Sequence, residues 1–389
     1  MKRAWLCATV AFVLALSVPA LADEAPEEVL KAVVKIRAIV PKEAHTAASL
    51  GTERVGCGVL IDSKGLILTT GYLIVESEAI EVTGPEGRVV QAAFVGYDHT
   101  TGFGVLRTHT PLNVKPMKLG QSSKITEGDP VMVAGHGGVD EAIGARVIMR
   151  QDFVGSWEYI LENAIYASPP IAEFGGAALI GPDGQLLGIG SLFAQLPILG
   201  VGSLPCNVFI PIDLLPPILD DLVTAGRPKK PARPWLGISA EAAHRRVFVT
   251  RVTNEGPAAQ AGIQTDDLIL KVNGRAVEGL ADFYRKVWGL GNAGVEVTLS
   301  ILKGTEIRDI TLRSADRYKF LQQPPQKKTG GSVDATGKFR SRSSQVNPLT
   351  LCCFKHLVQE PAQPLRFRQG AAWPISKFAI ISRARTIAE

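Results

Sequence analysis

Residues 56–70 read GCGVLIDSKGLILTT, and this stretch carries the strongest indication of the fold class. Its two apolar runs flank a polar turn, DSKG, at 62–65. Short apolar runs joined by a turn that contains glycine are typical of a β-hairpin. The same design recurs at 80–95, around GPEG, and at 177–189, around GPDG. Many short strands at regular spacing predict an all-β sandwich or barrel.

The charge of the chain is unevenly distributed. Its 389 residues are enough for two domains, and the 46% hydrophobic and 20% charged content is ordinary for a folded protein. The formal net charge of +5 comes from the C-terminal segment, because residues 322–389 hold 11 Lys and Arg against 3 Asp and Glu. Without that segment, Lys2 and Arg3, the net charge is −5. A mildly acidic body gives no electrostatic reason to expect a nucleic-acid partner.

The N-terminus reads as a secretory signal peptide over residues 1–22. Lys2 and Arg3 provide the positive start, residues 4–18 are almost entirely apolar, and ALA at 20–22 has the small-x-small pattern of a signal peptidase site. An uncleaved membrane anchor is the alternative, but the apolar run is short for a hydrocarbon core of about 30 Å. We therefore expect a periplasmic or otherwise exported protein with no membrane span after cleavage.

Two cysteines, Cys57 and Cys206, lie in the body of the chain. Export permits a disulfide between them, but the pairing stays open because a sequence does not show whether two Cα atoms come close enough. By default we expect both to be small buried residues. No spacing of Cys and His resembles a metal site, so we expect neither a metal ion nor a cofactor.

The chain divides at a proline-rich basic linker, RPKKPAR, at 227–233. Residues 23–226 form the β-rich domain, which closes with a helix at 214–223. Residues 321–389 are basic, show neither helical nor strand period and are predicted to be disordered, or to be an extension without function. Residues 234–320 form a smaller α+β domain with strands at 247–252, 268–272 and 295–302 and an amphipathic helix at 280–290.

Further motifs in the first domain occur in the order of a known family. After GCGVLIDSKGLILTT come VGYD at 95–98, FGVL at 103–106, GG at 175–176 and FIPID at 209–213. The set resembles the HtrA/Deg family of trypsin-like serine proteases, in which a Gly-Ser-Gly strand, an Asp-x-x-Gly turn and an Ile-Leu-Thr strand lead to the catalytic His. The resemblance covers residues 31–225 and implies a trypsin-like double β-barrel that assembles as a homotrimer.

The resemblance places Tyr72, Gly102 and Phe174 at the positions of the catalytic His, Asp and Ser. Serine proteolysis needs a hydroxyl nucleophile, an imidazole that takes its proton and a carboxylate that holds the imidazole. None of the three residues supplies its group, and Glu173 beside them would repel an oxyanion. We therefore expect a degenerate member without catalytic residues. An alternative dyad stays open, with candidates in His45, His99, His109, His136, Ser168 and Ser191.

The second domain opens with PWLGI at 234–238, which resembles the carboxylate-binding loop of PDZ domains. The bacterial PDZ pattern continues in GPAAQAG at 256–262, DDLIL at 266–270 and VNG at 272–274. Four elements in the right order make this a specific resemblance. It implies a groove for peptide C-termini.

The same resemblance implies which residues form that groove. Successive main-chain N–H groups cradle a terminal carboxylate, and glycine allows the carboxylate to approach closely. Tyr284, Val287 or Trp288 on the predicted helix are candidates for the side-chain pocket, with core packing as their alternative role. The loop residues implied in peptide binding are Trp235, Leu236, Gly237 and Ile238.

Three functions are compatible with these features. The favoured one is non-enzymatic: an exported HtrA-like pseudoprotease that binds polypeptide C-termini or unfolded segments through its PDZ domain, as scaffold, chaperone-like holder or regulator. The second is an active periplasmic serine endopeptidase of protein quality control with displaced catalytic residues. The third is an interaction module whose barrel itself forms the partner surface.

Overall fold

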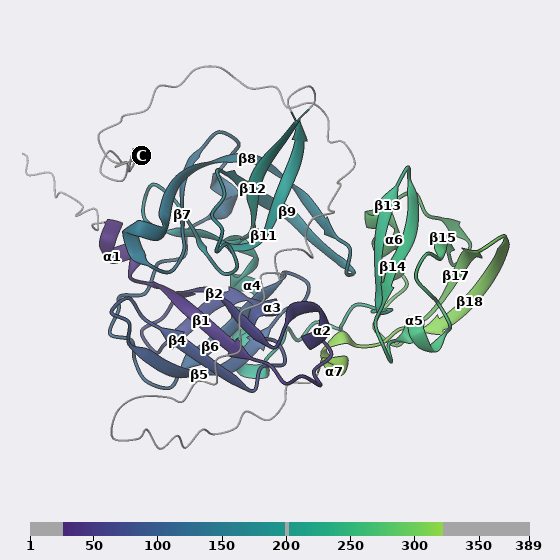
Figure 1. The fold of residues 1–389 in the computed structure, drawn as a ribbon, viewed down its shortest axis with the longest axis horizontal. Coiled ribbons are helices and arrows are strands. Elements are labelled where there is room, and N and C mark those ends of the chain that lie inside the picture. Colours follow the sequence, from purple (N-terminus) through teal and green to yellow (C-terminus); the bar gives the residue numbers. More distant parts are fainter. Residues whose placement is uncertain (1–25, 199–201, 322–389) are drawn as a thin grey trace, which may run out of the picture.

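The computed structural model describes residues 26–198 and 202–321. The predicted signal peptide at 1–22 and residues 322–389 of the predicted tail lie outside these residues. Two β-barrels lie side by side, and a smaller β domain lies next to them (Figure 1). None of the described helices has the length and apolar character that a membrane crossing needs.

The first barrel closes in the order β1-β2-β3-β6-β5-β4. The predicted hairpin at 62–65 forms because the Asp62 carboxylate accepts hydrogen bonds from the N–H groups of Lys64 and Leu66, at 2.8 and 2.7 Å. Gly65 completes the turn with a φ of +82°, which glycine adopts without strain. The elements are α1 (Pro26–Leu30), β1 (Val33–Ile39), α2 (Ala47–Leu50), β2 (Glu53–Leu60), β3 (Leu66–Thr70), α3 (Gly71–Ile74), β4 (Ala79–Thr83), β5 (Val89–Tyr97) and β6 (Phe103–Thr108).

The second barrel closes in the order β10-β11-β12-β9-β8-β7. The long strands β8 and β9 form a hairpin whose tip extends toward the C-terminal domain (Figure 1). The predicted closing helix ends at Gly226, whose φ of +74° is a left-handed cap. The elements are η1 (Ser122–Lys124), β7 (Pro130–Ala134), η2 (Gly138–Glu141), β8 (Ala142–Gly155), β9 (Tyr159–Ser168), β10 (Ala178–Ile180), β11 (Leu186–Ile198), β12 (Gly202–Pro211), η3 (Ile212–Leu214) and α4 (Pro216–Ala225).

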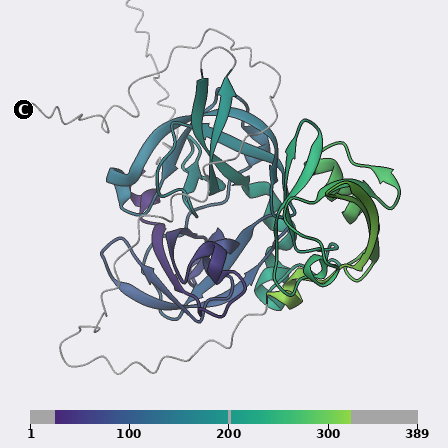
Figure 2. The ribbon, with the colours of Figure 1, turned by 45° about the vertical axis from the view of Figure 1, so that its right-hand side comes forward.

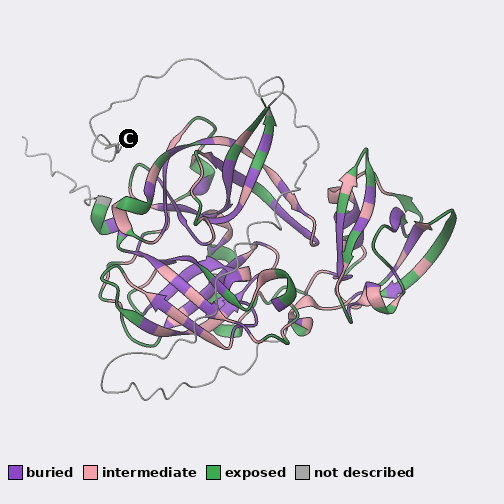
Figure 3. Cartoon of the chain, viewed as in Figure 1, coloured by how far each residue is buried: buried purple, intermediate pink, exposed green. Residues whose placement is uncertain are grey.

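One large apolar cluster includes residues of both barrels, and a second, smaller cluster lies within the second barrel. Buried residues run along most of the length of β3, β6 and β10 (Figure 3). Because successive residues of a strand point to opposite faces, both faces of these strands are covered. Cys57 and Cys206 are both buried and free. Their thiols therefore act as small core groups, and no disulfide joins them.

The C-terminal domain is a sheet in the order β13-β14-β15-β17-β18, with β16 paired to β15. Its core contains Phe283, Tyr284 and Val287 from α6, packed on the inner sides of the strands. Together with the barrels, this domain confirms the prediction of a mainly β protein with a double barrel followed by an α+β domain. The elements are β13 (Ile238–Ala243), β14 (Arg246–Val252), α5 (Pro257–Gln260), β15 (Leu268–Val272), β16 (Arg275–Ala276), α6 (Leu280–Trp288), β17 (Glu296–Lys303) and β18 (Glu306–Arg313).

The last helix, α7 (Arg317–Phe320), returns from the C-terminal domain to the first barrel (Figure 2). Tyr318 Oη donates to Asp98 Oδ1 at 2.8 Å. Leu321 is buried beside Val75 and Tyr97. The folded body therefore extends through Leu321, one residue into the region predicted as the tail.

Candidate functional site

The three positions predicted to correspond to a catalytic triad lie together where the two barrels meet. Tyr72 is on α3, Gly102 is in the turn before β6, and Phe174 is in the loop between β9 and β10. The Gly71 N–H donates to the Gly102 carbonyl at 2.8 Å. A Cβ atom on Gly175 would lie 2.6 Å from Tyr72 Oη, so the tyrosine reaches the neighbour of Phe174.

Two tyrosines lie at or beside these positions. Tyr72 Oη donates to the Ser191 carbonyl at 3.0 Å, and burial raises the pKa of Tyr72 to about 12. A phenol with that pKa is not a general base at neutral pH. Tyr159 Oη donates to the Thr101 carbonyl at 2.7 Å and would lie 2.9 Å from a Cβ atom on Gly102. Tyr159 thus takes the space that a carboxylate at position 102 needs.

The residues considered for an alternative catalytic dyad form other contacts in the described part of the chain. Within residues 26–198 and 202–321, no hydrogen bond joins one of their imidazoles to a serine hydroxyl. His45 packs on Phe320 at 4.2 Å between ring centroids, and His99 packs on Tyr318 at the same distance. His109 is exposed, and Ser168 Oγ donates to the Pro205 carbonyl at 2.9 Å.

His136 has an acidic partner but no nucleophile. Its Nε2 atom lies 2.8 Å from the exposed Glu173 carboxylate, and its main-chain N–H donates to Cys57 Sγ at 3.3 Å. Burial raises the pKa of the Cys57 thiol to about 12. Because the thiolate is the reactive form, Cys57 is inert at neutral pH. In the part of the chain that the structure describes, no group of three or more His, Cys, Asp or Glu could hold a metal ion.

The loop before β13 binds a carboxylate in this structure. The N–H groups of Gly237 and Ile238 lie 2.8 and 3.0 Å from Glu158 Oε1, and the N–H of Leu236 lies 3.0 Å from Oε2. Gly237 has a φ of +79°, which turns these successive N–H groups toward one point. Consecutive N–H groups in such a concavity form an anion site. The carboxylate belongs to the tip of the β8–β9 hairpin.

The other predicted groove residues lie in two places. Tyr284 and Val287 are buried in the core of the C-terminal domain, where Ile160 from β9 packs into the same cluster. Trp235 lies beside the loop: its main chain pairs with Ala315, and its ring lies 4.6 Å from that of Phe320 and 3.4 Å from where a Cβ atom on Gly237 would be. Trp235 therefore braces the loop.

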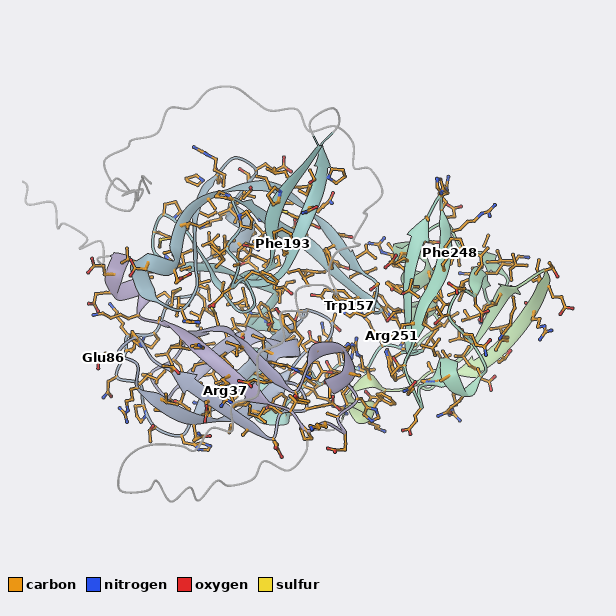
Figure 4. The ribbon with its side chains drawn as sticks, viewed as in Figure 1. Arg37, Glu86, Trp157, Phe193, Phe248 and Arg251 are labelled. Atoms are coloured by element: carbon orange, nitrogen blue, oxygen red, sulfur yellow. The ribbon has the colours of Figure 1, made fainter. Side chains whose placement is uncertain are left out.

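The pKa of the Glu158 carboxyl group is strongly shifted. Burial raises the pKa of its carboxyl group to about 7, against the opposing effects of the three N–H donors and of Arg317. Its φ of +55° lies in the left-handed region, which is uncommon for a residue with a side chain. The neighbouring Trp157 lies at the hairpin tip, between the second barrel and the C-terminal domain (Figure 4).

Comparison with known proteins agrees with both halves of this architecture. The trypsin-like peptidase domain matches residues 56–189, and the PDZ domain matches residues 234–313. The chain is thus similar to trypsin-like peptidases and to PDZ domains in the expected order, and to periplasmic serine endoproteases of the DegP type. It is 26% identical over 306 residues to a probable periplasmic serine endoprotease DegP-like protein of Halomonas elongata, covering 74% of this chain and 60% of that one. It is also 26% identical over 290 residues to the periplasmic serine endoprotease DegP of Escherichia coli, covering 72% of this chain and 59% of the relative.

The chain spans about 60% of the length of these curated relatives. A solved structure of the HtrA-type protease AlgW with a decapeptide is 21% identical, with a TM-score of 0.45, and covers 77% of this chain and 98% of that chain.

Sequence reasoning missed Glu158. The segment GSWE at 155–158 reads as an ordinary polar turn, and its partner residues are about 80 positions away. The tryptophan of this segment was an available signal, because aromatic side chains are usually covered by a partner surface.

Proposed function

We propose that this chain is an exported HtrA-like pseudoprotease that binds polypeptide C-termini or unfolded segments through its PDZ domain, as scaffold, chaperone-like holder or regulator. The observation that carries the proposal is the set of three N–H groups, from Leu236, Gly237 and Ile238, that already hold a carboxylate. A free C-terminus presents the same group. A peptide bound there adds a strand to the edge of a sheet, and β13 is the edge strand next to the loop.

The contents of the barrel cleft support the non-enzymatic part of the proposal. Tyr72, Gly102 and Phe174 offer neither a nucleophile nor a base of suitable pKa, and Tyr159 fills the space beside Gly102. In a serine protease, loss of the complete triad lowers turnover by about a millionfold. The barrels therefore serve as a scaffold that carries the PDZ domain.

Export is supported by the signal-like pattern at 1–22 and by relatives named as periplasmic proteins. In that compartment, polypeptides with exposed ends are the ligands that a PDZ groove recognises.

A C-terminal peptide library screened against the full chain tests the proposal. We expect enrichment of sequences with a free carboxyl end, loss of binding when the same peptides are amidated, and dissociation constants of roughly tens of micromolar or weaker. The matched pair of variants is Gly237→Arg, in the loop, and Gly262→Arg, which has a similar φ of +77° and open space around it. Gly237→Arg should abolish capture and Gly262→Arg should retain it. Equal capture of free and amidated peptides would refute the proposal.

A further inference from the structure

The tip of the β8–β9 hairpin, residues 156–158, lies in the groove where a peptide C-terminus is expected. Besides the three N–H groups that hold the Glu158 carboxylate, the N–H of Ala240 donates to the Ser156 carbonyl at 2.8 Å. Ile238 and Ala240 are alternate residues of β13, so both N–H groups point outward from the same edge of the sheet. The hairpin tip therefore forms the main-chain and carboxylate contacts of an added peptide strand.

Apolar side chains of the hairpin also contact the groove, as the last side chain of a bound peptide would. Ile160 is 5% exposed and belongs to the core cluster of the C-terminal domain, with Leu236, Tyr284 and Val287. Val154, from the other strand of the hairpin, packs against the same cluster. A carboxylate next to a branched aliphatic side chain is the chemistry of a peptide that ends in Val, Ile or Leu. The groove holds both parts of that end group at once.

Contacts outside the groove hold the hairpin in place. Arg285 on α6 forms an ion pair with Asp152 on β8 at 2.7 Å. Arg317 Nη1 donates to the Trp157 carbonyl at 3.4 Å. Both arginines belong to the C-terminal part of the chain and both acceptors to the hairpin. The exposed ion pair between Arg285 and Asp152 contributes little free energy, but it fixes the direction from which the hairpin enters the groove.

We propose that the β8–β9 hairpin is an internal ligand of the PDZ groove, with the Glu158 carboxylate in place of a peptide C-terminus, so that a peptide binds only when the hairpin withdraws. This inference rests on the proposed function, because it assumes that the groove takes peptide C-termini. It adds a regulatory contact: the second barrel and a peptide compete for the same N–H groups. Peptide binding therefore releases the PDZ domain from the hairpin.

Competition within one chain has a measurable consequence. A tethered ligand acts at an effective concentration of about millimolar, above the dissociation constant expected for a single PDZ groove. The apparent affinity for a free peptide falls in proportion to the fraction of molecules whose groove is open. If the hairpin occupies nine grooves in ten or more, removing its carboxylate tightens peptide binding by about tenfold or more.

The test compares the full chain with Glu158→Ala, Glu158→Gln and a control, Glu162→Ala. Glu162 is an exposed acid on the same hairpin, in β9. One measurement is hydrogen exchange of the segment 235–240, followed by mass spectrometry without any peptide. The other is fluorescence anisotropy with an N-terminally labelled hexapeptide that ends in a free Val carboxylate, and with its amidated form. Glu158→Gln keeps the shape of the side chain, which guards against misfolding of the alanine variant.

We expect faster exchange at 235–240 and at least tenfold tighter binding of the free-acid peptide in Glu158→Ala. Glu158→Gln should show smaller changes in the same direction, because its amide oxygen still accepts from the N–H groups of the loop, and Glu162→Ala should behave as the wild type. Unchanged exchange and unchanged affinity in both Glu158 variants, with a peptide that still binds, would overturn the internal ligand while the proposed function stands. Faster exchange with no binding by any variant would instead refute the proposed function, and with it the competition.

Discussion

Gly102→Asp places a carboxylate at the position predicted for the catalytic Asp. The structure predicts that this substitution destabilises the first barrel. Gly102 has a φ of +88°, where an L-side chain costs about 1–2 kcal/mol. A Cβ atom there lies 2.9 Å from Tyr159 Oη and 3.3 Å from Ile210 Cδ1. Tyr159 is buried and bonded to the Thr101 carbonyl, and loss of a buried hydrogen bond of this kind costs about 1–3 kcal/mol.

These contributions predict that Gly102→Asp lowers the free energy of unfolding by about 2–5 kcal/mol. Gly87→Asp is the matched control, because Gly87 lies in the same barrel with a φ of +76° and open space around it. The control should lose only about 1–2 kcal/mol. Urea unfolding of the full chain, followed by intrinsic fluorescence, measures both losses. Equal losses for the two variants would show that the cleft has room for a carboxylate and would refute the reasoning.

Three further predictions concern other groups. Burial raises the pKa of Glu158 to about 7 from an ordinary value of about 4.5, so the closed hairpin binds more protons than the open one and loses stability as the pH rises through that interval. Peptide affinity of the wild type should therefore increase between pH 5 and pH 8 by anisotropy, and a profile as steep in Glu158→Gln would contradict this. Cys57 and Cys206 should resist a thiol reagent at pH 8 and react only after unfolding in urea, as shown by peptide mapping, because burial raises both pKa values to about 12. Tyr318→Phe removes the bond to Asp98 and should lower the free energy of unfolding by about 1–2 kcal/mol in a urea titration, with no loss expected only if α7 is not docked.

Much of the fold could be predicted from local sequence. The hairpin at 62–65 follows from an aspartate that caps its own turn and a glycine at the left-handed position, both of which are local features. The helix α6 was predicted from apolar residues at helical spacing, and the structure ends it at Trp288, two residues before the predicted end. Such elements depend on neighbours in the chain.

The side chains that fill the two sites were harder to predict from the sequence. The positions Tyr72, Gly102 and Phe174 came from motif order, but the role of Tyr159 in the cleft depends on packing between the two barrels. The contact of Glu158 with the loop could not be predicted for the same reason. Its contact with Gly237 joins two domains, and no local pattern encodes a side chain that imitates a peptide end.

The proposed loss of peptidase activity is tested most directly by labelling the purified full chain with a serine-directed phosphonate, followed by intact-mass measurement and a casein digestion. We expect no added mass and no cleavage, because Tyr72, Gly102 and Phe174 stand where we expect the groups for proton transfer and attack in a serine protease. An adduct on a single serine, together with casein cleavage that disappears when that serine is replaced by alanine, would contradict it.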